Sequence, residues 1–151
     1  MAKSLGGMVD VGGKRETKRR AVAVSTITMK AKAFKSFRQG DSPKGDVLEA
    51  AKIAGIMAAK STPSLIPMCH PLEITKVKIA FDVNEENNSI TSMAEVLCLG
   101  KTGVEMEALV AAAVSSLTIY DMMKWADQSM SITETHLLSK SGGQSGDYKR
   151  G

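Results

Sequence analysis

Two runs of alternating apolar residues, joined by a short polar turn, constrain the fold more than any other feature of the sequence. In residues 74–83, Val77, Ile79 and Phe81 alternate with polar neighbours. This pattern indicates a strand of a sheet that has one wet face. The letters NEENNS are typical of a turn, and residues 90–99 return as a second strand. We therefore predict a β-hairpin in the middle of the chain.

The segments on either side of this hairpin predict two further strands and two helices. Residues 20–29 alternate and are rich in β-branched side chains, which favours a strand. Asp46 with Glu49 forms a capping-box pattern before an apolar face, so a helix begins there, and Pro63 and Pro67 mark its end. A long apolar helix over 104–126 and a strand over 131–138 complete the pattern, whereas 37–45 is predicted to be a loop.

The resulting order is strand, helix, strand, strand, helix, strand, which is the split-βαβ arrangement. We predict an α+β, ferredoxin-like βαββαβ fold, with an antiparallel sheet and helices packed on one face. Readings that misplace the first or the last strand stay open. The chain has 151 residues and no repeat, so we expect one domain over 1–151. Within it, 1–18 is predicted to be a mobile basic arm and 139–151 a glycine-rich basic loop.

Charge and cysteine usage restrict the partners and the compartment. The net charge of +4 favours an anionic partner, and a nucleic acid, a nucleotide or a phosphorylated metabolite would each suit. Cys69 and Cys98 form no CxxC pair, which favours a reducing environment. The first residues lack the apolar stretch of a secretory signal, and no window reaches the apolar length that spans a bilayer. We expect a cytoplasmic protein without a membrane partner.

Two basic segments are candidate phosphate sites. Lys14 and Arg19 lie in KRETKRR, where they either grip phosphate oxygens or belong to a solvated arm. Lys44 lies just before a predicted helix N-terminus, which attracts anions. A desolvated lysine at such a place suits a general acid or base, and the alternative is an exposed loop lysine.

Two further strings carry a histidine and paired carboxylates. His70 in PMCHPL suits anion binding better than a Cys–His nucleophile pair, and a structural histidine is an equal alternative. The spacing of Cys69, Cys98, His70 and His136 is not that of a zinc site. In GKTGVEMEAL, Glu105 and Glu107 occupy the first turn of a helix, where they either stabilise it or accept from the N–H groups of a guanine-type edge.

The string YDMMKW places an acid and a base on one helix. Asp121 and Lys124 are spaced i, i+3 and can touch, either as an exposed pair or as a partly buried proton-transfer pair. Glu107 and Asp121 are fourteen positions apart, which is roughly 21 Å along a helix axis. They cannot serve one small site within a single chain, so either only one matters or a pocket is shared between subunits.

Taken together, six strings in order resemble one family. The strings are MVDV, KGDV, IPMCHPL, KTGVEMEAL, LTIYDMMK and LLSKSGG, and the match runs from Met8 to about Lys149. In this order they are similar to the cyclic pyranopterin monophosphate synthases, the C-protein family of molybdenum cofactor (molybdopterin) biosynthesis. Two features depart from the family: Gln144 stands where relatives often carry lysine, and the N-terminal extension of some relatives is missing here.

The resemblance implies a fold, a reaction and a set of residues. It implies a ferredoxin-like subunit in a homohexamer, a trimer of dimers with active sites between subunits. The implied enzyme is a phosphorus–oxygen lyase that converts 3′,8-cyclo-7,8-dihydroguanosine triphosphate, a GTP-derived compound, into cyclic pyranopterin monophosphate, a pterin, with pyrophosphate release. It needs no redox cofactor and no protein-bound metal, and Mg²⁺ accompanying the triphosphate stays open. The implied catalytic residues are Asp121, Lys44 and Lys124; the implied substrate-binding residues are Met68, Cys69, His70, Met106, Glu107, Lys14, Arg19 and Lys140.

Two kinds of non-enzymatic protein are alternatives to this enzyme. An RNA-binding module of the RRM type shares the βαββαβ order, but it stacks bases on aromatic side chains of its central strands. Residues 90–99, ITSMAEVLCL, contain no aromatic residue. We therefore expect no nucleic-acid partner. A non-catalytic nucleotide-binding domain is not excluded by the sequence.

Overall fold

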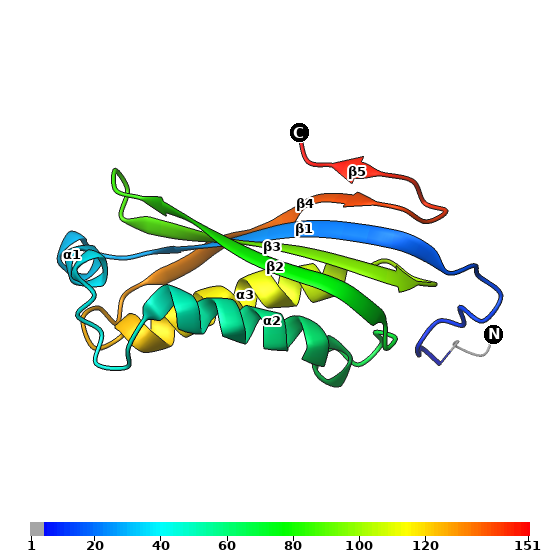
Figure 1. Cartoon of the computed structure of the whole chain (residues 1–151), viewed down its shortest axis with the longest axis horizontal. Coiled ribbons are helices and arrows are strands. Elements are labelled where there is room, and N and C mark those ends of the chain that lie inside the picture. Colours follow the sequence, from blue (N-terminus) through cyan, green and yellow to red (C-terminus); the bar gives the residue numbers. More distant parts are fainter. Residues whose placement is uncertain (1–4) are drawn as a thin grey trace.

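The computed structural model describes residues 5–151 and confirms the predicted α+β fold. The chain forms a five-stranded antiparallel sheet in the order β2-β3-β1-β4-β5. Figure 1 shows α2 and α3 covering one face of this sheet, with α1 at one end. The elements are β1 (Thr17–Thr28), α1 (Ala31–Gln39), α2 (Val47–Leu65), β2 (Glu73–Asn84), β3 (Ser89–Gly100), α3 (Glu105–Met123), β4 (Ser131–Ser141) and β5 (Tyr148–Lys149).

The predicted hairpin is present, and its arms are each one residue longer at both ends than predicted. Strands β2 and β3 pair from Asn84 opposite Ser89 to Glu73 opposite Leu99. On its other side β3 pairs along the whole of β1, from Thr28 opposite Ser89 to Thr17 opposite Gly100. The order of the first four strands is therefore that of a ferredoxin-like sheet, with β1 and β3 in the centre.

The alternation of side chains explains how the helices meet the sheet. Ile27, Ile90 and Val96 are fully buried on the face that α2 and α3 cover. Small residues let the two helices approach one another and the sheet. At Gly55 an added β-carbon would collide with the hydroxyl of Ser115 and lie 3.1 Å from the carbonyl oxygen of Ala111. The core therefore depends on close packing of small residues more than on large rings.

Helix α2 begins as predicted and ends later than predicted. The Asp46 carboxylate accepts from the backbone N–H of Glu49 at 3.0 Å, which is the N-cap that the sequence indicated. Pro63 was expected to end the helix, but it lies inside the last turn. A proline there removes only one backbone hydrogen bond close to a helix end, so the helix continues to Leu65 before Pro67.

Helix α1 is an element that the sequence analysis missed. Residues 37–45 were predicted to be a loop, but the first three of them complete α1. The helix packs Phe34 beside Phe37, with ring centroids 5.8 Å apart. It ends at Gly40, whose φ of 73° is left-handed and whose N–H donates to the carbonyl of Phe37 at 3.1 Å.

Both chain ends differ from their predicted bounds. Thr17 and Lys18, assigned to the basic arm, begin β1, and 139–141, assigned to the terminal loop, extend β4. Tyr148 and Lys149 form β5, which pairs with Lys140 and Ser139 of β4. The tail is therefore a hairpin that returns along the sheet edge. The first four residues of the arm lie outside the described residues.

One helix meets the length and composition of a membrane span, contrary to the sequence expectation. Helix α3 has 19 residues and a mean hydropathy of 1.3 in its most apolar window. Half of that window is buried inside the protein, between the sheet and α2. The apolar character of α3 is therefore that of a core helix, and it is weak evidence for a membrane span.

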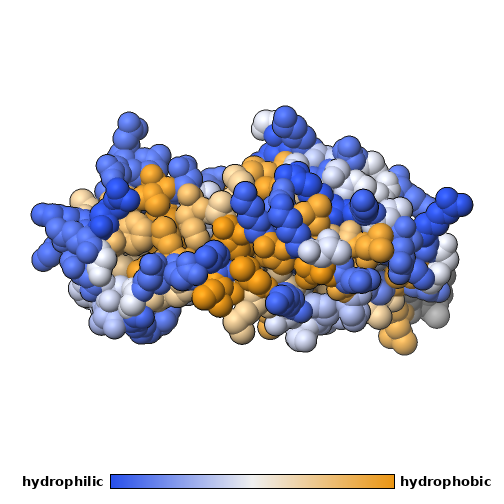
Figure 2. Space-filling view, in the orientation of Figure 1, coloured by the Kyte–Doolittle hydropathy of each residue, from blue (hydrophilic) through white to orange (hydrophobic). Residues whose placement is uncertain are grey.

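Apolar side chains also reach the surface. Figure 2 shows apolar surface across the middle of the face seen in Figure 1. On the helical layer, Ile53 and Met57 of α2 are 49% and 60% exposed, and Leu117 of α3 is 56% exposed. This surface is available for contact with another protein chain.

Candidate active site

A basic cleft lies at the end of the molecule where α3 begins. It has a volume of about 760 Å³ and is formed by the start of β1, the turn before α3, and the loop between β4 and β5. Three of the residues predicted to hold the triphosphate converge here, although they are far apart in the sequence. The lining residues are Lys14, Arg15, Thr17, Arg19, Thr102, Gly103, Glu105, Lys140, Gly142, Gly143, Gln144 and Ser145.

Arg19 is the most unusual charge in this cleft. Arg19 is only 9% exposed. The Nε atom donates to the carbonyl of Gly100 at 3.0 Å, and Nη2 donates to the carbonyl of Lys101 at 3.2 Å. Among residues 5–151 no carboxylate lies within salt-bridge distance of this guanidinium. A buried cation without a counter-charge is costly, so an anionic ligand would stabilise this site.

The other cations of the cleft include one that is paired with a carboxylate. The Nζ atom of Lys140 lies 3.4 Å from a carboxylate oxygen of Glu105 and donates to the hydroxyl of Ser145 at 3.4 Å. Lys14 and Arg15 approach from the N-terminal arm, where the N–H of Lys14 donates to the carbonyl of Val11 at 3.0 Å. The cleft thus combines the buried, hydrogen-bonded guanidinium of Arg19 with the cationic groups of Lys14, Arg15 and Lys140.

A smaller pocket of about 190 Å³ adjoins this cleft and shares three of its lining residues, Thr102, Gly103 and Glu105. All five predicted wall residues line it, namely Met68, Cys69, His70, Met106 and Glu107. The His70 ring atom Nε2 lies 2.6 Å from the carbonyl oxygen of Val9, so in this structure the histidine contacts the arm. The eight predicted substrate-binding residues therefore form one continuous region.

Glu107 places a buried carboxyl group with a raised pKa beside the small pocket. The residue is 2% exposed, and its Oε2 atom has no hydrogen-bond partner among the described residues. Burial, with a smaller contribution from the charge of Glu105, raises the pKa of Glu107 to about 7. Burial and then the charge of Glu107 raise the pKa of Cys98 to about 11, so that thiol stays protonated at neutral pH. A half-protonated carboxyl beside a pocket can both accept and donate hydrogen bonds.

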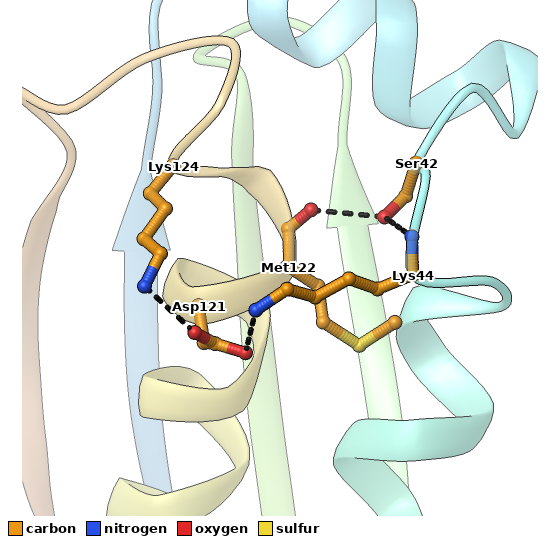
Figure 3. Close-up of polar contacts among 5 residues, drawn as sticks. All are labelled: Ser42, Lys44, Asp121, Met122 and Lys124. Atoms are coloured by element: carbon orange, nitrogen blue, oxygen red, sulfur yellow. Dashed lines mark hydrogen bonds and ion pairs between the residues drawn. The ribbon is translucent and has the colours of Figure 1, made fainter.

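The three predicted catalytic residues meet at the opposite end of α3 (Figure 3). Lys44 Nζ lies 2.8 Å from one carboxylate oxygen of Asp121, and Lys124 Nζ lies 2.9 Å from the other. The hydrogen bond from Lys44, followed by that from Lys124, lowers the pKa of Asp121. Each of the three side chains is about half exposed, so the partial burial expected from neighbouring Met and Trp residues is limited.

A hydroxyl group fixes the loop that carries Lys44. Ser42 Oγ donates to the carbonyl of Met122 at 2.9 Å and accepts from the backbone N–H of Lys44 at 3.3 Å. Figure 3 shows this hydroxyl bridging the loop and the end of α3. Met122 O is among the last carbonyls of the helix, which have no partner within the helix. The sequence analysis did not identify Ser42, because a serine two residues before a lysine is too common a pattern to indicate a functional residue.

Within one chain the two groups of residues do not meet. Glu107 is in the first turn of α3 and Asp121 in the last, which leaves the separation of roughly 21 Å that a straight helix dictates. The sequence analysis also missed several lining residues of the cleft, including Arg15, Gly142 and Gly143. The one available signal for the last two was the pair of adjacent glycines, which lie in the loop that returns the tail along β4.

The described structure is thus an α+β domain with a basic cleft at one end of a core helix and a Lys–Asp–Lys cluster at the other. Residues 8–143 match the MoaC family, and the chain belongs to that family.

Curated relatives with similar sequences share one name, cyclic pyranopterin monophosphate synthase. The Thermoanaerobacter sp. (strain X514) protein is 53% identical over 143 residues, covering 95% of this chain and 90% of the relative. The Listeria welshimeri protein is 52% identical over 142 residues, with 94% and 88% covered. The Staphylococcus aureus (strain Newman) protein is 53% identical over 146 residues, with 95% and 89% covered.

Among solved structures, the ferredoxin protease FusC in complex with Arabidopsis ferredoxin covers 69% of this chain and 10% of that chain, with 8% identity and a TM-score of 0.33. A likeness this low carries no argument.

Proposed function

We propose that this chain is a cyclic pyranopterin monophosphate synthase. In the proposed reaction, 3′,8-cyclo-7,8-dihydroguanosine triphosphate is rearranged to cyclic pyranopterin monophosphate. A substrate hydroxyl oxygen forms a bond to the α-phosphorus and closes the cyclic phosphate, while the bond from that phosphorus to the oxygen bridging the β-phosphate breaks and pyrophosphate leaves. Membership of the MoaC family supports this proposal, as do relatives of that name at 52–53% identity. The structural observation that carries it is the buried Arg19 guanidinium, which lines a basic cleft and has no carboxylate partner among residues 5–151.

The cleft suits the triphosphate of this substrate. The planar guanidinium of Arg19 can donate N–H hydrogen bonds to phosphate oxygens. The ammonium groups of Lys14 and Lys140 add two positive charges that can bind further phosphate oxygens. The adjoining pocket, with the Glu107 carboxyl, is of the right chemistry for a guanine-derived ring that presents N–H groups. In this proposal the phosphates lie in the larger cleft and the base in the smaller pocket.

The Lys44–Asp121–Lys124 cluster would supply the proton transfers of the rearrangement. Asp121 remains ionised because two ammonium groups hydrogen-bond to it, and it holds both lysines in place. Each lysine can then donate a proton to a developing alkoxide or amine, or accept one after losing its own. The two lysines lie at nearly the same distance from Asp121, 2.8 Å for Lys44 and 2.9 Å for Lys124.

We further propose that the active site is shared between subunits. Residues of the cleft and of the catalytic cluster lie too far apart to act on one substrate within a chain. A dimer that covers exposed apolar residues such as Ile53, Met57 and Leu117 would remove this difficulty, and a trimer of dimers is the assembly that the family resemblance implies. Sedimentation of the purified protein tests the hexamer directly.

Complementation tests the shared site. Arg19→Ala lies in one half of the proposed site and Lys124→Ala in the other. Subunits carrying one change each are expected to be inactive alone and to regain activity when co-expressed, because mixed interfaces contain one intact site. Lack of recovery in confirmed mixed oligomers would contradict a site shared between subunits.

The residue composition of the described structure bears on cofactor use. Within residues 5–151, no group of three His, Cys, Asp or Glu side chains is placed to hold a metal ion. We propose that the enzyme works without a resident metal or organic cofactor, with any Mg²⁺ arriving on the substrate triphosphate. The proposed location is the cytoplasm, and the proposed partners are the small-molecule substrate and further copies of the chain.

Pyrophosphate release from the cyclised GTP derivative is the direct test. Wild-type protein is expected to release it, and Lys44→Ala and Lys124→Ala are expected to lose turnover while folding normally. Lys52→Ala is a matched control, since Lys52 also forms an i, i+3 ion pair, with Glu49 at 2.8 Å, but lies outside both sites. If folded wild-type protein binds the substrate without releasing pyrophosphate, the non-catalytic nucleotide-binding reading replaces this one.

A further inference from the structure

Three glycines of one loop share a left-handed backbone but differ in what surrounds them. Gly142, Gly143 and Gly146 lie between β4 and β5 with φ angles of 88°, 89° and 79°. The loop is closed by the pairing of β4 with β5 and by the N–H of Gly142, which donates to the Asp147 carboxylate at 3.3 Å. A side chain at any of the three positions would cause similar backbone strain.

The space beside each glycine is different. A β-carbon at Gly142 would collide with the backbone carbonyl of Lys18, and one at Gly146 would meet nothing within 4 Å. A β-carbon at Gly143 would collide with the Nη1 atom of Arg19 and lie 3.0 Å from its Cζ and 3.4 Å from its Nη2. All three nearest atoms at Gly143 therefore belong to one guanidinium.

The Arg19 side chain cannot avoid such a β-carbon without loss. Its Nε and Nη2 atoms already donate to the carbonyls of Gly100 and Lys101, and the residue is 91% buried. A displacement away from residue 143 would stretch or break these bonds. By contrast, Nη1 makes no hydrogen bond to residues 5–151, and Arg19 and Gly143 both line the cleft.

We propose that Gly143 is a positioning residue for the Arg19 guanidinium, and that its missing side chain sets the direction in which Arg19 meets the polyphosphate end of the substrate. This inference rests on the proposed function for the identity of the anion. The bare backbone at residue 143 acts as a stop against which the guanidinium lies. Arg19 is then held on two sides, by the Gly100–Lys101 carbonyls and by the glycine turn, before any ligand enters.

Preorganisation of this kind affects binding more than chemistry. In the proposed site the guanidinium contacts the part of the substrate that leaves as pyrophosphate, whereas the proton transfers are assigned to the Lys44–Asp121–Lys124 cluster. Gly143→Ala is therefore expected to raise KM and to weaken binding of inorganic pyrophosphate by about tenfold or more, the range of a lost charge-assisted hydrogen bond. The effect on kcat is expected to be smaller than the effect on KM.

The loop itself provides the matched controls. Gly146→Ala adds the same methyl group at the same kind of backbone angle, but into open space. It is expected to change pyrophosphate binding by less than about twofold, because only backbone strain is added. Arg19→Ala is expected to weaken binding by itself, and in that background Gly143→Ala is expected to have no further effect.

Isothermal titration of the assembled protein with inorganic pyrophosphate, together with kcat and KM on the substrate, tests the proposal. Equal effects of Gly143→Ala and Gly146→Ala would overturn it, and so would a Gly143→Ala effect that persists in the Arg19→Ala background. If Gly143→Ala fails to fold, the double variant with Arg19→Ala must fold, since the colliding side chain is gone; an unfolded double variant refutes the assignment.

The same measurements separate this inference from the proposed function. Absence of turnover in wild type would overturn the proposed function, while the pyrophosphate titrations would still rank the glycine variants. Normal turnover with no difference between the two glycine variants would overturn the inference alone.

Discussion

Protonation of Glu107 makes a quantitative prediction about stability. The pKa of this buried carboxyl rises from 4.5 in the unfolded chain to about 7 in the folded protein. Between these values the folded state binds a proton that the unfolded state does not, so stability falls as the pH rises. At about 1.4 kcal/mol for each pH unit, the loss between pH 4.5 and pH 8 is about 3 kcal/mol.

The perturbation is Glu107→Gln, which keeps the shape of the side chain and removes the titration. Below pH 5 the two proteins should have similar stability, because both then bury an uncharged group. At pH 8 the variant should be more stable by about 3 kcal/mol. Urea unfolding at pH 5, 6, 7 and 8 and at one protein concentration measures the difference. With a slope of roughly 1–3 kcal/mol per molar urea, the midpoints should separate by about 1 M or more.

Glu95→Gln is the control with the opposite sign. Hydrogen bonds from Lys76 and then Arg20 lower the pKa of Glu95, so its contribution is present above its unfolded pKa of 4.5 and is lost as the pH falls. Between pH 5 and pH 8 its effect on stability should be constant. If the difference between wild type and Glu107→Gln is as flat as this control, the carboxyl is ionised throughout and burial does not govern it.

Three further predictions concern other parts of the molecule. Ser42→Ala should lower kcat by about threefold to tenfold, the value of one lost hydrogen bond, because the loop that holds Lys44 is released; Ser42→Thr should retain activity in the same pyrophosphate-release assay. Inorganic pyrophosphate should raise the melting temperature of wild type, and Arg19→Ala should abolish most of the rise. Gly55→Ala should destabilise the protein by about 1–3 kcal/mol in urea unfolding, because its β-carbon collides with Ser115.

The parts of the fold that the sequence predicted are those where burial imposes a clear period. Strands β2 and β3 alternate, because one face of the hairpin is buried and the other is wet. Helix α1 was missed because only Ala33 and Phe34 of its nine residues are buried, which leaves too few apolar positions for a helical pattern. Strand β5 was missed because two residues cannot show a period at all.

In the candidate site, a contact between residues close in the sequence could be predicted from their spacing, whereas contacts between residues far apart in the sequence could not. The contact of Asp121 with Lys124 follows from their i, i+3 spacing and was predicted directly. The contact of Lys44 with Asp121 joins residues 77 positions apart, and no local pattern encodes it. The cleft around Arg19 depends on how the tail returns along β4, which only the folded chain shows. These long-range contacts came from the family resemblance or were not predicted.

The two ends of α3 carry different parts of the proposed site, and the proposed dimer would bring them together. Its N-terminal end carries Glu105 and Glu107, which the positive end of the helix dipole favours, and its C-terminal end is flanked by Lys44 and Lys124, which the negative end favours. In a two-fold dimer with antiparallel α3 helices, the first end of each helix would approach the second end of the other. Each site would then receive a pocket carboxylate and a cationic cluster from different chains. The same symmetry would create two equivalent sites, so loss of one contact at the dimer interface should impair both.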